Sequence, residues 1–262
     1  MKFSMMTYTL MRQGSFTPED CVRTAAALKM EGIDWITTYG RDPRELRRMS
    51  VDAGLTVAAH TFFLRENADE TLLDAAKRSL DDACMLGAPL VMIVPIPFAG
   101  VADPAENRRR WCDRLNRVAP LAAERSLLMS VENFPGMESP FVTAADFHEA
   151  KKLVPSLKLT FDDGNAATGE DPVESLKQCF GDVVHVHFKD WEIFDAPGEG
   201  RREMRDGRFY RAALVGEGAV DSRAVLRTLE ELGYEGFINI EYENNRYPGD
   251  LAVKKALEYL RQ

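Results

Sequence analysis

Short runs of β-branched and apolar residues alternate along the chain with longer stretches in which apolar positions recur at helical spacing. A bounded apolar run of about four to eight residues is typical of a buried strand, and a longer amphipathic stretch is typical of a helix. Their alternation along the whole chain predicts βα units on a parallel sheet. The predicted strands cover residues 2–8, 33–38, 55–60, 90–95, 127–132, 158–162, 183–188 and 237–242.

The predicted helix starts carry a repeated local signal. A short polar side chain accepts hydrogen bonds from the free N–H groups of a first helical turn, and proline next to it loses nothing because its missing N–H would have no partner. This pair of residues occurs at Thr17-Pro18, Asp42-Pro43, Asp103-Pro104 and Asp171-Pro172.

Eight βα units in 262 residues match a closed (β/α)8 TIM barrel, which typically has about 250 residues. We therefore predict an α/β protein with one barrel domain covering residues 1–262. A doubly wound open sheet is the alternative, and the lack of a GxGxxG or GxxxxGK[ST] loop after any strand weakens it. Residues 189–220 are too many for a plain βα loop, so we expect a lid or a substrate-facing flap there.

Composition and charge narrow the range of partners. The formal charge of −9 and the pI near 5.1 leave no global basic field for nucleic acid or anionic lipid. No window reaches the roughly 18 apolar residues of a membrane span, and the N-terminus lacks a signal-peptide pattern. We expect a cytoplasmic protein with a small-molecule partner. The sequence is compatible with a homo-oligomer but does not determine the oligomeric state.

The seventh predicted strand, VVHVHF, contains two of the four histidines of the chain. Side chains of a strand alternate between its faces, so Val184, Val186 and Phe188 share one face, and His185 and His187 share the other. The apolar face must pack against helices. Both histidines are therefore predicted to point into the barrel, with His187 nearer the C-terminal mouth, where barrel enzymes carry their chemistry.

The same alternation places polar side chains at the inward ends of other strands. His60 ends the third strand, and Glu132, Asp162 and Glu241 end the fifth, sixth and eighth. The presence of any one of these residues alone is explained by a salt bridge or by a hydrogen-bonded position in the core. Glu132, Asp162 and Glu241, however, come with His187 from adjacent strands, and three carboxylates cannot share a partly dry pocket unpaired.

A divalent cation would remove this conflict. Three carboxylates and one imidazole form an oxygen-rich ligand set that suits Mn²⁺ or Mg²⁺, and Co²⁺ would also fit. Zn²⁺ is disfavoured because the set contains no thiolate.

Four motifs follow the last four predicted strands in order. They are VENFPG (131–136), LTFDDGNA (159–166), HVHFKD (185–190) and INIEYE (238–243). With them the chain resembles, over nearly its whole length, the xylose-isomerase-like barrels of the sugar phosphate isomerase/epimerase type. The resemblance implies a TIM barrel in which Glu132, Asp162, His187 and Glu241 bind a metal, and in which both glutamates act as the acid and base on opposite faces of a substrate.

The resemblance also implies that His60 and Lys189 face substrate. Asn133 follows a ligand and is predicted to orient it or to contact substrate, and His185 or Lys189 is predicted to hold a developing oxyanion. One position departs from the family: Asn165 stands where many members have histidine. In the apurinic-endonuclease branch that histidine helps to bind additional zinc ions, so Asn165 argues against a multi-zinc nuclease.

These features predict a metal-dependent isomerase or epimerase of carbohydrate metabolism that moves a proton next to the carbonyl of a keto sugar or polyol. A lyase is the alternative, such as a dehydratase of an inosose-type keto-polyol. The enediolate that forms when the proton leaves the carbon next to the carbonyl can also expel a β-hydroxyl. A non-catalytic sugar-binding barrel is a third interpretation. The arginines of residues 201–211 and Arg246 are interpreted as a solvated basic surface rather than an anion site, and phosphorylation of the substrate is left open.

Overall fold

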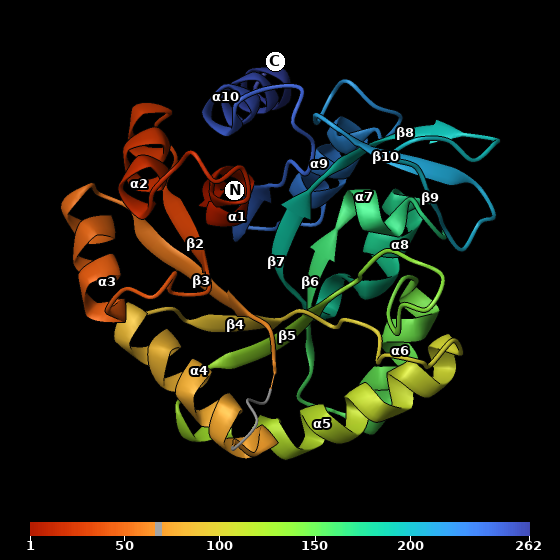
Figure 1. Ribbon diagram of the computed structural model, residues 1–262, viewed down its shortest axis with the longest axis horizontal. Helices are drawn as coiled ribbons and strands as arrows, with labels where there is room; N and C mark the ends of the chain where they lie inside the picture. The colour runs from red at the N-terminus through yellow and green to blue at the C-terminus, as the bar shows by residue number, and fades with distance from the viewer. Residues whose placement is uncertain (66–69) are drawn as a thin grey trace.

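The predicted apolar runs pair side by side in chain order and close into a barrel of parallel strands (Figure 1). The computed structural model describes residues 1–65 and 70–262. Three further strands lie between the seventh and eighth barrel strands, so the last barrel strand is β11. The barrel order is β1 (Lys2–Met6), β2 (Gly32–Ile36), β3 (Thr56–Phe62), β4 (Leu90–Ile93), β5 (Leu128–Glu132), β6 (Lys158–Asp162), β7 (Val183–Phe188) and β11 (Phe237–Ile240), which pairs with β1. The predicted TIM barrel is confirmed.

A ring of helices surrounds the barrel (Figure 1). Thr17, Asp42, Asp103 and Asp171 each accept a hydrogen bond from a backbone N–H in the first turn of the helix that follows, as predicted. The helices are α1 (Thr7–Met11), α2 (Pro18–Ala27), α3 (Pro43–Asp52), α4 (Leu72–Leu86), α5 (Pro104–Glu124), α6 (Ala144–Leu153), α7 (Asp163–Ala166), α8 (Pro172–Cys179), the short 3-10 turn η1 (Phe180–Asp182), α9 (Ser222–Glu231) and α10 (Gly249–Leu260).

Apolar side chains fill the space between strands and helices, and polar side chains fill much of the barrel interior. Trp35 of β2 points outward, and its indole N–H donates to Ser50 of α3 at 3.2 Å. Inside the barrel, Ser4 Oγ donates to Asn239 Oδ1 at 2.5 Å, and Asn239 Nδ2 donates to Asp34 Oδ2 at 2.8 Å. This hydrogen-bonded polar layer lies beneath the mouth of the barrel.

The pairing of β2 with β3 contains a β-bulge. Ile33 pairs with Val57, but the next residue, Asp34, pairs with Ala59. One extra residue reverses the face to which the following side chains point. As a result Thr61 lies inside the barrel, where its hydroxyl donates to Asp34 at 3.2 Å.

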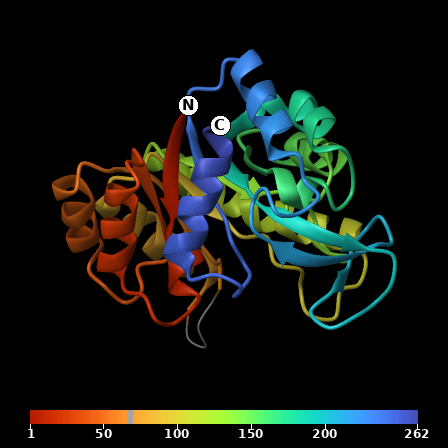
Figure 2. The same cartoon turned by 90° about the horizontal axis from the view of Figure 1, so that it is seen from above.

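The long segment after β7 forms a small antiparallel sheet. Its strands are β8 (Asp190–Phe194), β9 (Arg202–Glu203) and β10 (Phe209–Ala213), in the order β8-β10-β9. This sheet, which we call the flap, stands on the side of the barrel away from α2 and α3 (Figure 2). Trp191 and Tyr210 are buried in its own apolar cluster.

The flap is fastened to the barrel at several points. The indole N–H of Trp191 donates to Gly164 O at 2.9 Å, and the Tyr210 hydroxyl donates to Ala167 O at 3.1 Å. Arg205 pairs with Asp146, at the start of α6, at 2.6 Å. The segment expected to be a lid or flap is therefore a docked sheet, and a lid function stays a prediction.

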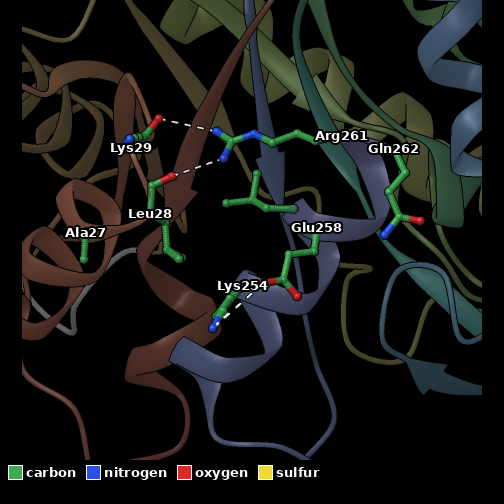
Figure 3. Close-up of a pocket in the computed structure, with 8 residues that line it drawn as sticks. Ala27, Leu28, Lys29, Lys254, Glu258, Arg261 and Gln262 are labelled. Atoms are coloured by element: carbon green, nitrogen blue, oxygen red, sulfur yellow. Dashed lines mark hydrogen bonds and ion pairs between the residues drawn. The ribbon is translucent and has the colours of Figure 1, made fainter.

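A hollow of about 550 Å³ lies at the opposite, N-terminal end of the barrel, between α2 and α10 (Figure 3). Arg261 crosses it and donates to the carbonyl oxygens of Leu28 and Lys29 at 3.3 and 3.4 Å. TIM-barrel chemistry is found at the C-terminal end of the strands, where Glu132, Asp162, His187 and Glu241 lie.

Candidate metal centre

Four side chains from neighbouring strands converge at the C-terminal mouth. Glu132 ends β5, Asp162 ends β6, His187 lies in β7 and Glu241 follows β11. One potential ligand atom from each lies within 4.8 Å of the others, and all four residues are buried. The structure thus brings together the four residues that strand alternation selected.

The Nδ1 atom of His187 is the nitrogen that faces the carboxylates. It lies 2.6 Å from Glu132 Oε1 and 3.6 Å from Glu241 Oε2. Asp162 Oδ1 accepts the Asn165 N–H at the start of α7 at 2.6 Å. Asp162 Oδ2 and Glu241 Oε2 are buried and have no hydrogen-bond partner among the described residues.

The electrostatics of the cluster favour a bound cation. Burial raises the pKa of Asp162 well above its ordinary value, and the neighbouring Glu132 and Glu241 raise it further. Burial also raises the pKa of Glu132, although His187 opposes this shift. Buried carboxylates either take up protons or gain a counter-charge. The orphaned oxygens and the hard, oxygen-rich donor set fit a divalent metal ion.

Lys189 is the ammonium of the site. Its Nζ lies 2.9 Å from Glu241 Oε1 and 2.9 Å from Glu243 Oε2. Burial by itself would lower the pKa of Lys189, but Glu241 and Glu243 raise it. Lys189 therefore stays charged, and it fixes the orientation of a carboxylate of the cluster.

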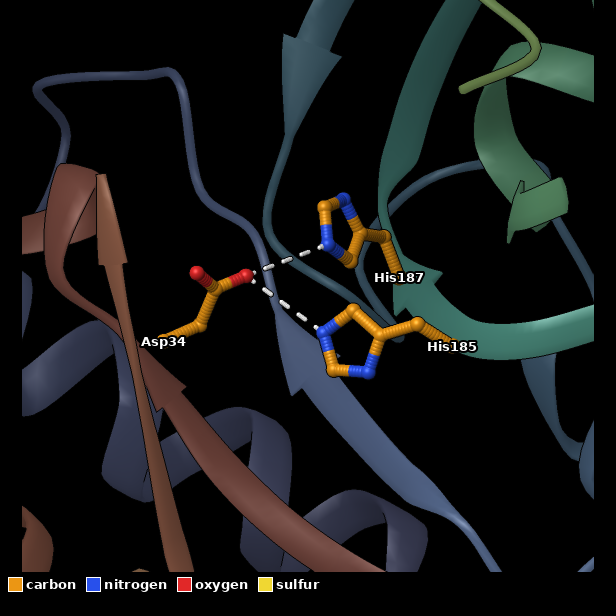
Figure 4. Close-up of side chains that lie close together, drawn as sticks. All are labelled: Asp34, His185 and His187. Atoms are coloured by element: carbon orange, nitrogen blue, oxygen red, sulfur yellow. Dashed lines mark ion pairs between the residues drawn. The ribbon is translucent and has the colours of Figure 1, made fainter. Parts of the chain in front are cut away.

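Behind the cluster, Asp34 connects the two histidines (Figure 4). Its Oδ2 lies 3.7 Å from His187 Nε2 and 3.4 Å from His185 Nε2. A carboxylate behind a metal-binding histidine orients the ring and raises its basicity. Sequence reasoning missed Asp34, although a carboxylate at an inward position of the apolar run IDWITT was a readable signal. His185, predicted to contact substrate, lies one layer below the mouth and contacts Asp34.

The motifs after β6 and β7 interlock through short backbone contacts. Asp163 Oδ1 accepts the Lys189 N–H at 2.9 Å. A Cβ added at Gly164 would collide with the Lys189 carbonyl, so only glycine permits this approach. The DDGN and HFKD segments thus hold the Lys189 backbone against Asp163 and Gly164.

Asn133, predicted to orient a ligand or to contact substrate, binds the backbone of Asp162. Its Nδ2 donates to Asp162 O at 2.7 Å, and its Oδ1 accepts from Asp162 N at 2.8 Å. Both ends of the amide are thereby engaged. This contact is compatible with the orienting role, which stays a prediction.

The inward orientation predicted for His60 is wrong. The bulge in β3 turns Thr61 into the barrel and His60 toward the helices, where its ring lies 5.8 Å from that of Phe62. His60 Nδ1 is 2.9 Å from the carbonyl oxygen of Trp35. Thr61 takes the place expected for His60 in the wall of the site.

A cavity of about 150 Å³ lies above the cluster. Glu132, Glu241 and Glu243 form its polar side. The opposite wall is mainly apolar and comes from the first four strands and the residues that follow them. This wall comprises Met6, Tyr8, Ile36, Thr61, Phe63, Met92 and Val94, and Phe134 completes the lining.

A closed barrel with a buried carboxylate–imidazole cluster at its C-terminal mouth is the arrangement of a TIM-barrel enzyme. The chain matches the model of the family described as xylose isomerase-like TIM barrel over residues 22–262. It therefore belongs to the xylose isomerase-like TIM barrel family, as its motifs predicted.

Individual relatives differ in their activities. An inosose dehydratase of Geobacillus thermodenitrificans is 25% identical over 271 residues, covering 95% of this chain and 90% of the relative. The probable 3-DHS dehydratase AsbF of Bacillus anthracis superposes with a TM-score of 0.78 at 18% identity, covering 100% of this chain and 99% of that structure. D-psicose 3-epimerase of Clostridium cellulolyticum gives a TM-score of 0.77 at 14% identity, covering 100% and 98%. The predicted isomerase class is not confirmed, because the dehydratase alternative has at least equal support.

None of the described helices combines the length and the apolar character needed to span a bilayer.

Proposed function

We propose that this chain is a divalent-metal-dependent dehydratase of a cyclic keto-polyol. The observation that carries the proposal is the buried cluster in which Glu132 and Glu241 flank Asp162 and His187, with two carboxylate oxygens unpartnered among the described residues. The similarity to inosose dehydratases over 95% of the chain favours loss of water over isomerisation. The lyase alternative is thus preferred to the isomerase predicted from sequence.

Glu132, Asp162, His187 and Glu241 would hold the metal, with His187 binding through Nδ1. The oxygen-rich donor set suits Mn²⁺, Mg²⁺ or Co²⁺, and Zn²⁺, which imidazole and carboxylate ligands also bind, is a further candidate. When bound, the ion polarises the substrate carbonyl and stabilises negative charge on its oxygen.

One of the two glutamates carries the proton. One of Glu132 or Glu241 takes the proton from the carbon next to the carbonyl, and the C–H electrons move onto the carbonyl oxygen. Lys189 donates a hydrogen bond to that oxygen while negative charge develops. The electrons then return, the β-carbon–oxygen bond breaks, and the protonated glutamate gives its proton to the departing hydroxide, so that one water leaves for each proton removed.

The test is product analysis with purified protein. The chain is stripped of metal, reloaded with Mn²⁺ and incubated with a panel of inososes in D₂O, and products are followed by NMR and mass spectrometry. We expect loss of one water. Glu132→Gln and Glu241→Gln should each lower turnover by ~10²–10⁴, whereas Glu230→Gln on the exposed face of α9 should leave it unchanged. Full activity in both site variants would refute the assignment.

An epimerase is the second candidate, because two glutamates on either side of one substrate suit deprotonation and reprotonation on opposite faces. It predicts a product isomeric with the substrate and deuterium at the α-carbon. A non-catalytic sugar-binding barrel predicts neither product nor exchange. The same NMR experiment separates the three.

A further inference from the structure

A polar lobe of about 510 Å³ lies beside the cavity above the metal centre. Tyr8 and Glu243 line both spaces, so the lobe adjoins the site of the proposed chemistry. Arg12, Arg202 and Arg211 line the lobe, which we call the arginine lobe. Glu243 is the carboxylate among its lining residues.

Arg12 is positioned without being neutralised. Its Nη1 donates to Asn244 O and to Asn245 Oδ1, both at 2.9 Å, and both acceptors are uncharged. Within residues 1–65 and 70–262 it forms no ion pair. A half-buried guanidinium held by neutral groups keeps its full charge for a ligand.

The carboxylates near the other two arginines are shared. Glu243 lies 2.9 Å from Lys189 Nζ, and its contact with Arg202 Nη2 is longer, at 3.8 Å. Glu192 pairs with Arg211 at 2.6 Å and also with Arg246 at 2.9 Å. One carboxylate therefore serves two cations in each case, and the arginine lobe keeps an excess of positive charge in a chain that is acidic overall.

We propose that the arginine lobe binds an anionic substituent of the substrate, a carboxylate or a phosphate, while the carbonyl end of the substrate reaches the metal centre. This rests on the proposed function for the location of the reacting end. The planar guanidinium of Arg12 matches either anion with two parallel N–H donors. The substrate class is thereby narrowed from a neutral keto-polyol to an acidic one, and the solvated-surface interpretation of Arg202 and Arg211 is replaced.

Binding of matched ring compounds tests the proposal without depending on turnover. Titration calorimetry compares myo-inositol, which is neutral, with quinate, which carries a carboxylate, and with myo-inositol 1-phosphate, on both Mn²⁺-loaded and metal-stripped protein. We expect at least one anionic compound to bind about 10–100-fold more tightly than myo-inositol. The tighter of the two identifies carboxylate or phosphate as the preferred anion, and added salt should weaken that preference.

Two variants locate the effect. Arg12→Gln should remove at least about tenfold of the anion preference while leaving myo-inositol binding unchanged. Arg208→Gln, in the flap between Arg202 and Arg211 but outside the lining, is the control and should behave as the unmodified protein. Equal affinities for neutral and anionic rings, no binding of any anionic probe, or an unchanged preference in Arg12→Gln would each overturn the proposal.

Failure of this proposal and failure of the proposed function are separate outcomes. A protein that prefers anionic rings through Arg12 but dehydrates neither inososes nor cyclic keto-polyols that carry a carboxylate or phosphate leaves the arginine lobe supported and the dehydratase refuted. A protein that dehydrates neutral inososes with no anion preference gives the reverse result.

Discussion

Replacing Asp190 with asparagine removes half of the acceptors that hold the loop before α9. The buried carboxylate of Asp190 accepts four backbone N–H groups. Oδ1 accepts from Trp191 and Val220 at 2.7 and 2.9 Å, and Oδ2 accepts from Gly216 and Gly218 at 3.0 and 2.9 Å. An amide oxygen can keep two of these bonds, but the amide NH₂ then points at two other donors.

The expected cost follows from these contacts. A buried N–H left without an acceptor costs about 1–3 kcal/mol, so two cost about 2–6 kcal/mol. Burial raises the pKa of Asp190, which means that the neutral amide avoids a desolvation cost borne by the carboxylate. With this offset we expect a loss of about 2–5 kcal/mol, which lowers Tm by roughly 5–15 °C in a chain of this size.

Calorimetry and urea unfolding followed by circular dichroism measure the loss. Asp195→Asn, in the same flap, is the control, because its side chain is 93% exposed and should change stability by less than about 0.5 kcal/mol. If Asp190→Asn melts within about 2 °C of the unmodified protein, the carboxylate does not hold this loop.

Two further predictions concern metal affinity and pH. Asn133→Ala releases the backbone of Asp162 and should weaken Mn²⁺ binding by about 10–100-fold with little change in helix content; titration calorimetry measures this, and unchanged affinity would contradict the orienting role. Partial burial opposes ionisation of Asp182, but hydrogen bonds from Lys151 and Lys158 hold its pKa below the ordinary value. A lowered folded-state pKa stabilises the fold above the unfolded-state pKa of about 3.9, and this stabilisation disappears as pH falls through the folded-state value. Urea unfolding should therefore show Asp182→Asn to be less stable than the unmodified protein at neutral pH and equally stable in strong acid; a gap that persists in acid would exclude the ionic origin.

The alternation of side chains along strands accounts for most of the site residues that were correctly predicted from the sequence. It placed His187, Glu132, Asp162 and Glu241 on the inner wall, because the one register shift between β6 and β7 comes before His185 and the pairing is regular from there to Asp162 and His187. It failed for His60 because a bulge leaves no mark in a run of small and β-branched residues such as TVAAH. Period-two reasoning holds only while the register is unbroken.

Contacts between distant segments were beyond sequence reasoning. The partnership of Asn133 with the Asp162 backbone, and of Asp190 with the loop before α9, depends on loop paths that no local pattern encodes. Residues 216–218, Gly-Glu-Gly, also depend on contacts that only the three-dimensional structure shows. Gly216 has a φ of +89°, and a Cβ at Gly218 would collide with the Asp190 carboxylate.

The two sides of the cavity come from different halves of the barrel, so the residues on one side can be substituted independently of those on the other. The residues that would hold the metal come from β5 to β7 and β11, whereas Met6, Ile36 and Met92 come from β1, β2 and β4. Substitutions among these three apolar side chains alter the shape presented to a substrate and leave the ionic cluster untouched. New substrate preferences can therefore arise from single replacements on one half without loss of the reaction on the other, which makes these three positions the natural targets for a directed-evolution library.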